Sequence, residues 1–114
     1  MWIFEAQFKL KPEADIKDMI SLFKEIAVPL YNQIPGCQWV SILEYKSDFG
    51  IQPQWDYSFV EVWESKEAND KAVADGYIGL DNNSKLAQTG YYQKLMSMAE
   101  SSTMEYAEVI ASNK

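Results

Sequence analysis

The groups best suited to chemistry in this 114-residue chain lie on one alternating segment, Trp55–Trp63, which reads WDYSFVEVW. Glu61 and Trp63 are two residues apart, so on a β-strand both side chains would point to the same side. A carboxylate in an apolar cavity has a raised pKa, as a general base working near neutral pH requires. An indole can stack on a planar substrate. Both residues are therefore candidates for catalysis, weighed against a hydrogen-bonded structural glutamate and a packed core tryptophan.

The residue types that the chain lacks narrow its chemistry. It contains neither histidine nor arginine, which argues against histidine-bound zinc or haem iron, Ser–His and Cys–His pairs, and arginine clamps on anions. The net charge of −7 makes a nucleic-acid partner unfavourable. We expect no metal and no cofactor, so that carboxylates, tyrosines, tryptophans and amides would have to do any chemistry.

Composition also bounds the location of the chain. Apolar residues make up 47% of it, yet no apolar run approaches the roughly 20 residues of a membrane span. The first ten residues lack a basic start, and Glu5 and Gln7 interrupt what would be the apolar part of a signal peptide. Cys37 is alone, so no internal disulfide can form. We predict a cytoplasmic protein with one domain, residues 1–114.

Hydrophobic spacing predicts six elements. Alternation predicts strands over Trp2–Leu10, Cys37–Lys46, Trp55–Trp63 and Thr103–Ala111. Helical spacing predicts a first helix after Pro12 that ends near Ile34 and is disturbed by Pro29. A second helical part would start with Ser65 as its N-cap, break over Tyr77–Asn83, and continue from Ser84 to Ala99. The order β-α-β-β-α-β is that of the ferredoxin-like α+β fold, a four-stranded antiparallel sheet with helices on one face.

The two faces of the expected sheet differ in character. We expect the helices to cover mainly aliphatic side chains: Val40, Ile42, Val60, Val62, Ala107 and Val109, with Phe4, Ala6 and Phe8. The other face would carry aromatic and polar groups, among them Gln7, Trp39, Leu43, Tyr45, Phe59, Glu61, Trp63, Tyr106 and Glu108. So large an apolar patch usually marks an interface, so we predict a homodimer formed through this face.

The strand-to-helix junction VEVWESKEA, Val60–Ala68, resembles the recurring "v-W-s-k-e-a" junction of the antibiotic-biosynthesis monooxygenase (ABM) type of dimeric α/β-barrel protein. The resemblance implies sheet-to-sheet dimers that hold a small molecule between each sheet and its helices. Enzymes of this type include cofactor-free oxygenases of aromatic polyketides and haem-degrading oxygenases, and many members have no assigned activity. Trp63 matches the strand tryptophan of the family. Gln7 falls near the position of its strand-one asparagine, whereas the histidine of the haem-degrading members has no counterpart.

Three functions remain open at this point. In a cofactor-independent monooxygenase, a phenolic or enolic substrate would lose a proton to Glu61 or through Gln7, and Trp63 and Tyr45 would hold its ring. A small hydrophobic or aromatic ligand would also meet aromatic side chains, for which the candidates are Trp39, Tyr45, Phe59 and Tyr106. The alternatives are a non-catalytic ligand-binding or stress-associated protein, and an oxygen-independent isomerase or lyase with a carboxylate base. The adjacent Tyr91 and Tyr92 could close a pocket beneath the sheet or pack in the core. Composition does not separate these functions.

Overall fold

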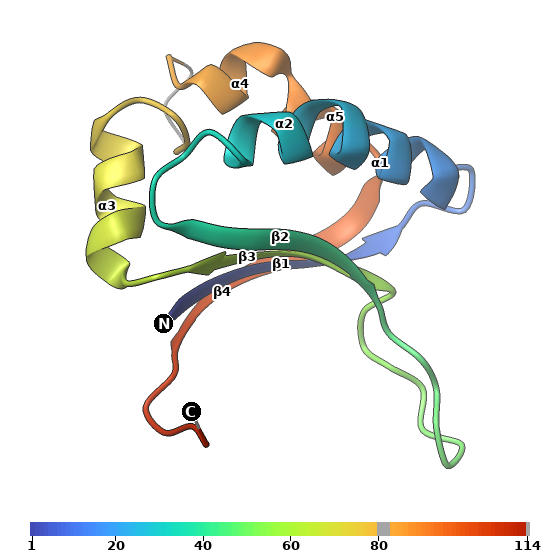
Figure 1. The fold of residues 1–114 in the computed structure, drawn as a ribbon. Coiled ribbons are helices and arrows are strands. Elements are labelled where there is room, and N and C mark those ends of the chain that lie inside the picture. Colours follow the sequence, from blue (N-terminus) through green and yellow to red (C-terminus); the bar gives the residue numbers. More distant parts are fainter. Residues whose placement is uncertain (80–82, 114) are drawn as a thin grey trace.

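The sheet and its helices form two layers. The computed structural model describes residues 1–79 and 83–113. Within them an antiparallel sheet has the order β2-β3-β1-β4, with all helices on one face (Figure 1). Its strands are β1 (Trp2–Leu10), β2 (Cys37–Glu44), β3 (Tyr57–Trp63) and β4 (Ala99–Glu108). This order confirms the predicted ferredoxin-like α+β fold, and the sheet does not close on itself. No helix among the described residues is long and apolar enough to cross a membrane.

The first helical segment contains a wide turn. It consists of α1 (Ile16–Leu22), the π-helical turn η1 (Phe23–Ala27) and α2 (Val28–Tyr31). It begins later than predicted, because Asp15 caps it by accepting a hydrogen bond from the Lys17 N–H at 2.9 Å. The Val28 N–H bonds back five residues to the Phe23 carbonyl. Pro29 has no N–H of its own to donate, and the distortion expected from it is found in the turn just before it.

The second helical segment is in three pieces. They are α3 (Lys66–Ala74), α4 (Lys85–Thr89) and α5 (Tyr91–Ser97). The predicted cap is confirmed, since the Ser65 hydroxyl accepts from the Ala68 N–H at 3.1 Å. The single helix predicted from Ser84 is wrong, because Gly90 adopts a left-handed conformation (φ 76°) that separates α4 from α5. Residues 80–82 of the predicted break lie outside the described part of the chain.

The faces predicted for β3 and β4 are reversed in the structure. On the helix side, Trp63, Glu61 and Phe59 pair with Trp2, Phe4 and Ala6 of β1. Tyr106 pairs with Phe4 and Glu108 with Trp2, so they too lie on the helix side. Val60, Val62 and Ala107 therefore lie on the other side of the sheet. Because successive side chains of a strand alternate between faces, an alternating pattern that is wrong by one residue exchanges every side chain between the two faces.

Aromatic rings of the sheet and of the helices pack together in the core under the helices, alongside aliphatic side chains. The Phe59 ring lies 6.1, 5.8 and 5.7 Å from the rings of Phe23, Tyr31 and Tyr91, all at steep angles. These edge-to-face contacts come from η1, α2 and α5, and they make Phe59 the centre of the core.

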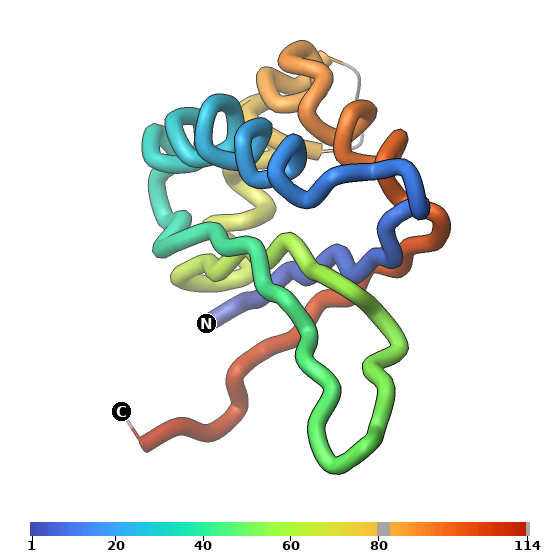
Figure 2. The backbone as a smooth tube through the Cα atoms, turned by 90° about the vertical axis from the view of Figure 1, so that its right-hand side faces the viewer, coloured from blue at the N-terminus to red at the C-terminus, as the bar shows by residue number. Residues whose placement is uncertain are grey.

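We call the side of the sheet away from the helices the open face; it carries Ile3, Glu5, Gln7, Trp39, Ser41, Leu43, Val60 and Val62. Trp39 and Leu43 are 51% and 44% exposed there. The β2–β3 hairpin and the segment after β4 both extend beyond the sheet on this side (Figures 1 and 2). The open face is thus flanked by two projecting segments and is covered by none of the described helices.

A substitution at Gly36, in the turn before β2, can test how closely α3 packs against that turn. The φ of Gly36 is 84°, and a Cβ added there would lie 2.5 Å from the Cβ of Ala68. We expect Gly36→Ala to lower the free energy of unfolding by about 2–4 kcal/mol, from backbone strain and overpacking. The matched control is Gly76→Ala, because Gly76 has a φ of 81° but no described atom within 4 Å of an added Cβ. It should lose only about 1 kcal/mol in urea denaturation; equal losses would contradict the close approach.

Candidate functional site

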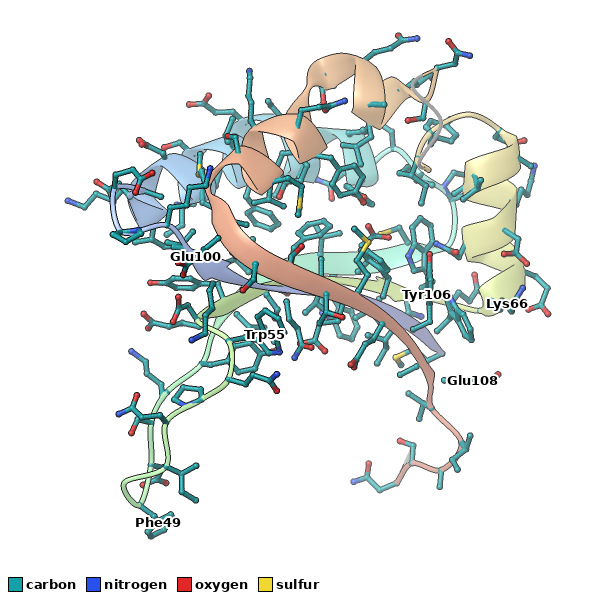
Figure 3. All side chains as sticks on the ribbon, turned by 180° about the vertical axis from the view of Figure 1, so that it is seen from behind. Phe49, Trp55, Lys66, Glu100, Tyr106 and Glu108 are labelled. Atoms are coloured by element: carbon teal, nitrogen blue, oxygen red, sulfur yellow. The ribbon has the colours of Figure 1, made fainter. Side chains whose placement is uncertain are left out.

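A cavity of about 660 Å³ lies between the helix side of the sheet and helices α3, α4 and α5. Its apolar lining includes Phe4, Val73, Ile78, Met96 and Met104. Its polar groups are Glu61, Asn69, Tyr92, Gln93 and Tyr106. Figure 3 shows Tyr106 on β4 near α3, and Tyr106 is one of the residues that line the cavity. A mostly apolar hollow with a few convergent polar groups is typical of a small-molecule site.

Glu61 is the most strongly held polar group of the cavity. The Tyr31 and Tyr92 hydroxyls donate to its Oε2 at 2.7 and 3.2 Å, and the Trp63 indole N–H donates to its Oε1 at 3.0 Å. The carboxyl group is only 2% exposed. Its three donors come from three elements, α2, α5 and β3, so the position of the carboxyl is fixed by the packing of the whole helix layer on the sheet.

Burial sets the protonation behaviour of this cluster. It raises the pKa of Glu61, and the three hydrogen bonds, which favour the carboxylate, offset only part of that effect. The pKa values of Tyr31 and Tyr92 lie well above the ordinary value because both phenols are buried beside Glu61. At neutral pH both tyrosines therefore stay neutral and act as donors. Glu61 gains a proton more readily than an exposed glutamate, which is the property of a base.

The structure divides the sequence-predicted site residues into two groups. Glu61 and Tyr106 line the cavity, whereas Trp63 and Phe59 are fully buried behind it. Trp63 reaches the cavity only through its hydrogen bond to Glu61. It is thus placed to position the carboxyl rather than to stack on a bound ring.

The other three predicted residues, Gln7, Trp39 and Tyr45, lie on or beside the open face. The Gln7 amide donates to the Tyr45 hydroxyl at 2.9 Å, and that hydroxyl donates to Glu5 in a short hydrogen bond. Trp39 belongs to β2 and faces away from the helices. These residues are separated from Glu61 by the thickness of the sheet, so they cannot share one ligand in the cavity with it.

Three polar residues of the site were missed from the sequence: Tyr31, Asn69 and Gln93. Tyr31 continues a four-residue spacing with Phe23 and Ala27, and this was the available signal. Asn69 is a polar residue on the buried side of α3, which its local sequence does not reveal. Of the tyrosine pair, Tyr91 packs in the core and Tyr92 lines the cavity. No group of three or more Cys, Asp or Glu among the described residues is arranged to hold a metal ion.

Fold comparison shows that the chain shares its fold with solved structures, among them ABM-like monooxygenases and a dimeric ferredoxin-like protein. SnoaB, a cofactor-independent oxygenase from Streptomyces nogalater, matches 98% of this chain with 95% of its own (TM-score 0.66, 14% identity). An antibiotic biosynthesis monooxygenase matches 97% of this chain with all of its own (TM-score 0.63, 21% identity). A dimeric ferredoxin-like protein of unknown function from Jannaschia sp. CCS1 matches 95% of this chain with 98% of its own (TM-score 0.70, 14% identity).

These likenesses concern the fold. No known family profile matches the sequence, and no curated protein does. The predicted resemblance to ABM-like proteins is therefore confirmed as a shared architecture, at identities that leave the reaction to be argued from the site.

The raised pKa of Glu61 predicts a pH-dependent difference between wild type and Glu61→Gln. A glutamine can accept from Trp63 and donate to the tyrosine hydroxyls, so it keeps the geometry without the charge. Below the unfolded pKa of about 4.3, Glu61 is neutral in both states and the wild type is relatively most stable. As pH rises through the higher folded pKa, the wild type should lose stability relative to the variant.

Thermal unfolding of both proteins between acidic and mildly alkaline pH measures this effect. The melting temperature of the wild type minus that of Glu61→Gln should decrease as pH rises. A difference that does not change with pH would mean that burial leaves the pKa of Glu61 where it is in the unfolded chain.

Proposed function

We propose that the chain binds a small aromatic molecule in the cavity and acts on it as a cofactor-independent monooxygenase, with Glu61 as general base. The observation that supports this most is a carboxyl group with a raised pKa, held by three donors at the wall of an apolar cavity. The substrate would be a phenol or an enolisable ketone, because its proton must be acidic enough for a carboxylate to remove. A cytoplasmic location, where Cys37 would stay reduced, fits this function.

The reaction can be written with dioxygen as the only co-reactant. Glu61 takes a proton from the substrate, and the electron pair left behind is delocalised over the ring as an enolate or phenolate. A ring carbon forms a bond to dioxygen, and the proton held by Glu61 passes to the distal oxygen to give a hydroperoxide. Loss of water from the hydroperoxide converts that carbon, which is a ring CH in a phenol and a CH₂ in an enolisable ketone, into C=O. One oxygen atom enters the product, the other leaves as water, and dioxygen is the oxidant.

Each side chain has a separate part in this scheme. Tyr92 lines the cavity and donates its one O–H to Glu61; once Glu61 has taken the proton, that hydroxyl can turn to the substrate oxygen and stabilise its negative charge. Tyr31 and Trp63 are positioning residues, because they hold the carboxyl without lining the cavity. Phe4 and Tyr106, whose ring centroids are 5.2 Å apart, offer an apolar wall for a flat ring.

A non-catalytic ligand-binding protein is the second candidate. The observation in its favour is that Glu61 is almost fully buried and accepts hydrogen bonds on both oxygens, as a purely structural acid would. In that case the cavity would hold a ligand without changing it.

Oxygen consumption with a panel of polycyclic phenols and enolisable ketones separates these functions. Glu61→Gln should lower kcat by about 10²–10⁴, the usual contribution of a general base. Trp63→Phe removes a hydrogen bond that lowers the pKa of Glu61, so its rate profile should shift to higher pH. The control is Glu100→Gln, an exposed glutamate on β4 (Figure 3), which should leave turnover unchanged. Turnover that persists without oxygen would instead indicate isomerase or lyase chemistry, and binding without turnover a binding protein.

We also propose that two copies of the chain pair through their open faces. The exposed Trp39 and Leu43 lie on that face, and the two projecting segments extend on the same side of the sheet (Figures 1 and 2). The Jannaschia protein, which has the same fold, is named as dimeric. In such a dimer each cavity would remain accessible, because it lies on the helix side of its own sheet.

Leu43→Lys tests the pairing. A lysine at this position would be buried against the second copy at a high free-energy cost, so the variant should run as a monomer in native mass spectrometry. Lys17→Leu, on exposed α1 outside the open face, is a control that should keep the dimer. A wild-type chain that is monomeric at micromolar concentration would overturn the proposal.

A further inference from the structure

Asn69 on α3 is a buried amide that faces the cavity and is not paired with the protein. It is only 6% exposed and lines the cavity. Its backbone N–H bonds to the Ser65 carbonyl at 3.3 Å, as expected in a helix. Its side-chain amide makes no hydrogen bond to any other described residue. The amide therefore keeps both its donors and its acceptor for whatever occupies the cavity.

Two other polar groups of the described residues, the Trp2 indole N–H and the Tyr91 hydroxyl, are buried without a partner, but neither residue lines the cavity. Glu61 accepts three hydrogen bonds, and the Ser84 hydroxyl accepts from the Ala87 N–H at 3.0 Å. The Ser58 hydroxyl is unpaired but belongs to the open face. The amide atoms of Asn69 are not among the fully buried unpaired atoms of the described residues, so they face cavity space that water or a ligand can occupy. Asparagine is a poor helix former, so an apolar residue would suit α3 better at this position unless the amide binds what occupies the cavity.

The chemistry of a carboxamide narrows that ligand. Its N–H donor and its C=O acceptor lie side by side in one plane. A ligand that satisfies only one of them leaves the other unpaired in an apolar cavity. Both are satisfied by a flat edge with an acceptor next to a donor, as when asparagine pairs with the N6/N7 edge of adenine. In a small ring system the simplest such edge is a cyclic amide, with N–H beside C=O.

We propose that Asn69 recognises the cyclic amide edge of a flat, fused-ring ligand through two parallel hydrogen bonds. The inference rests on the proposed use of the cavity, and it adds the substrate class: a lactam of the quinolone type whose enol or phenol group is presented to Glu61. Phe4 and Tyr106 contact the faces of the ligand's rings. Asn69 binds the N–H and C=O at the ligand's edge and so selects a lactam over a ring system without these groups. Asn69 is thus a specificity-determining residue.

The test compares three probes of similar shape. 2-Quinolone carries N–H beside C=O, N-methyl-2-quinolone keeps only the acceptor, and 2-naphthol keeps the fused rings with a hydroxyl alone. Wild type should bind 2-quinolone about tenfold or more tightly than the N-methyl compound by isothermal titration. Asn69→Leu should abolish that ratio while its affinity for 2-naphthol stays unchanged. Gln33→Leu is the control, because Gln33 is an exposed amide that does not line the cavity, and it should keep the ratio.

Thermal unfolding of the ligand-free variants supplies a second readout. Asn69→Leu should be at least as stable as wild type, since leucine is the better helix former and matches the apolar lining of the cavity. A lower melting temperature would mean that the amide has a structural role in the folded chain and would overturn the proposal.

The outcomes also separate this inference from the function on which it rests. Equal affinity of the wild type for the two quinolones would overturn the role of Asn69 and leave the cavity as a ligand site. Failure of all three probes to bind would overturn both. Selective binding without oxygen-dependent turnover would support Asn69 recognition and count against the monooxygenase.

Discussion

The removal of one carboxyl group from water governs this structure. A buried glutamate is tolerated only if its oxygens find donors, because an unpaired buried charge is costly. Glu61 finds them on β3, α2 and α5, and among the described ion pairs none involves it. The donors can meet at one point only when the sheet register, the wide turn in the first helical segment and the break at Gly90 are all in place. The local irregularities of the chain are thus linked by one polar cluster.

The sequence predicted the elements better than their orientation. In β1 the residues Glu5, Gln7 and Lys9 mark one side as polar, and that phase was correct. In β3 both alternating sets are apolar or aromatic, so alternation alone gives two equally good phases. The choice between them depends on the rings of Phe23, Tyr31 and Tyr91, which come from distant elements. Local patterning carries no information about such contacts.

The candidate site was predictable to the same extent. Glu61 and Trp63 could be grouped because they share a strand and a two-residue spacing. Tyr31, Asn69 and Tyr92 join them only through tertiary packing. Fold likeness does not fill this gap, since one fold supports many activities and the site residues determine which one a chain has. The chemistry proposed for this chain therefore depends on its own buried acid and amide rather than on its architecture.

The wide turn η1 makes the hydrogen bond between Tyr31 and Glu61 depend on the number of residues in the first helical segment. Met19, Phe23, Ala27 and Tyr31 recur every four residues. In a regular α-helix each such step overshoots a full turn by about 40°, so that after three steps Tyr31 would have rotated well away from the sheet. The extra residue in the turn absorbs part of this surplus. A single-residue deletion between Phe23 and Ala27 would turn everything after it by about 100° and separate the Tyr31 hydroxyl from Glu61. Length variation in this helix, unlike length variation in the β2–β3 hairpin, would thus change the acidity of a group in the cavity.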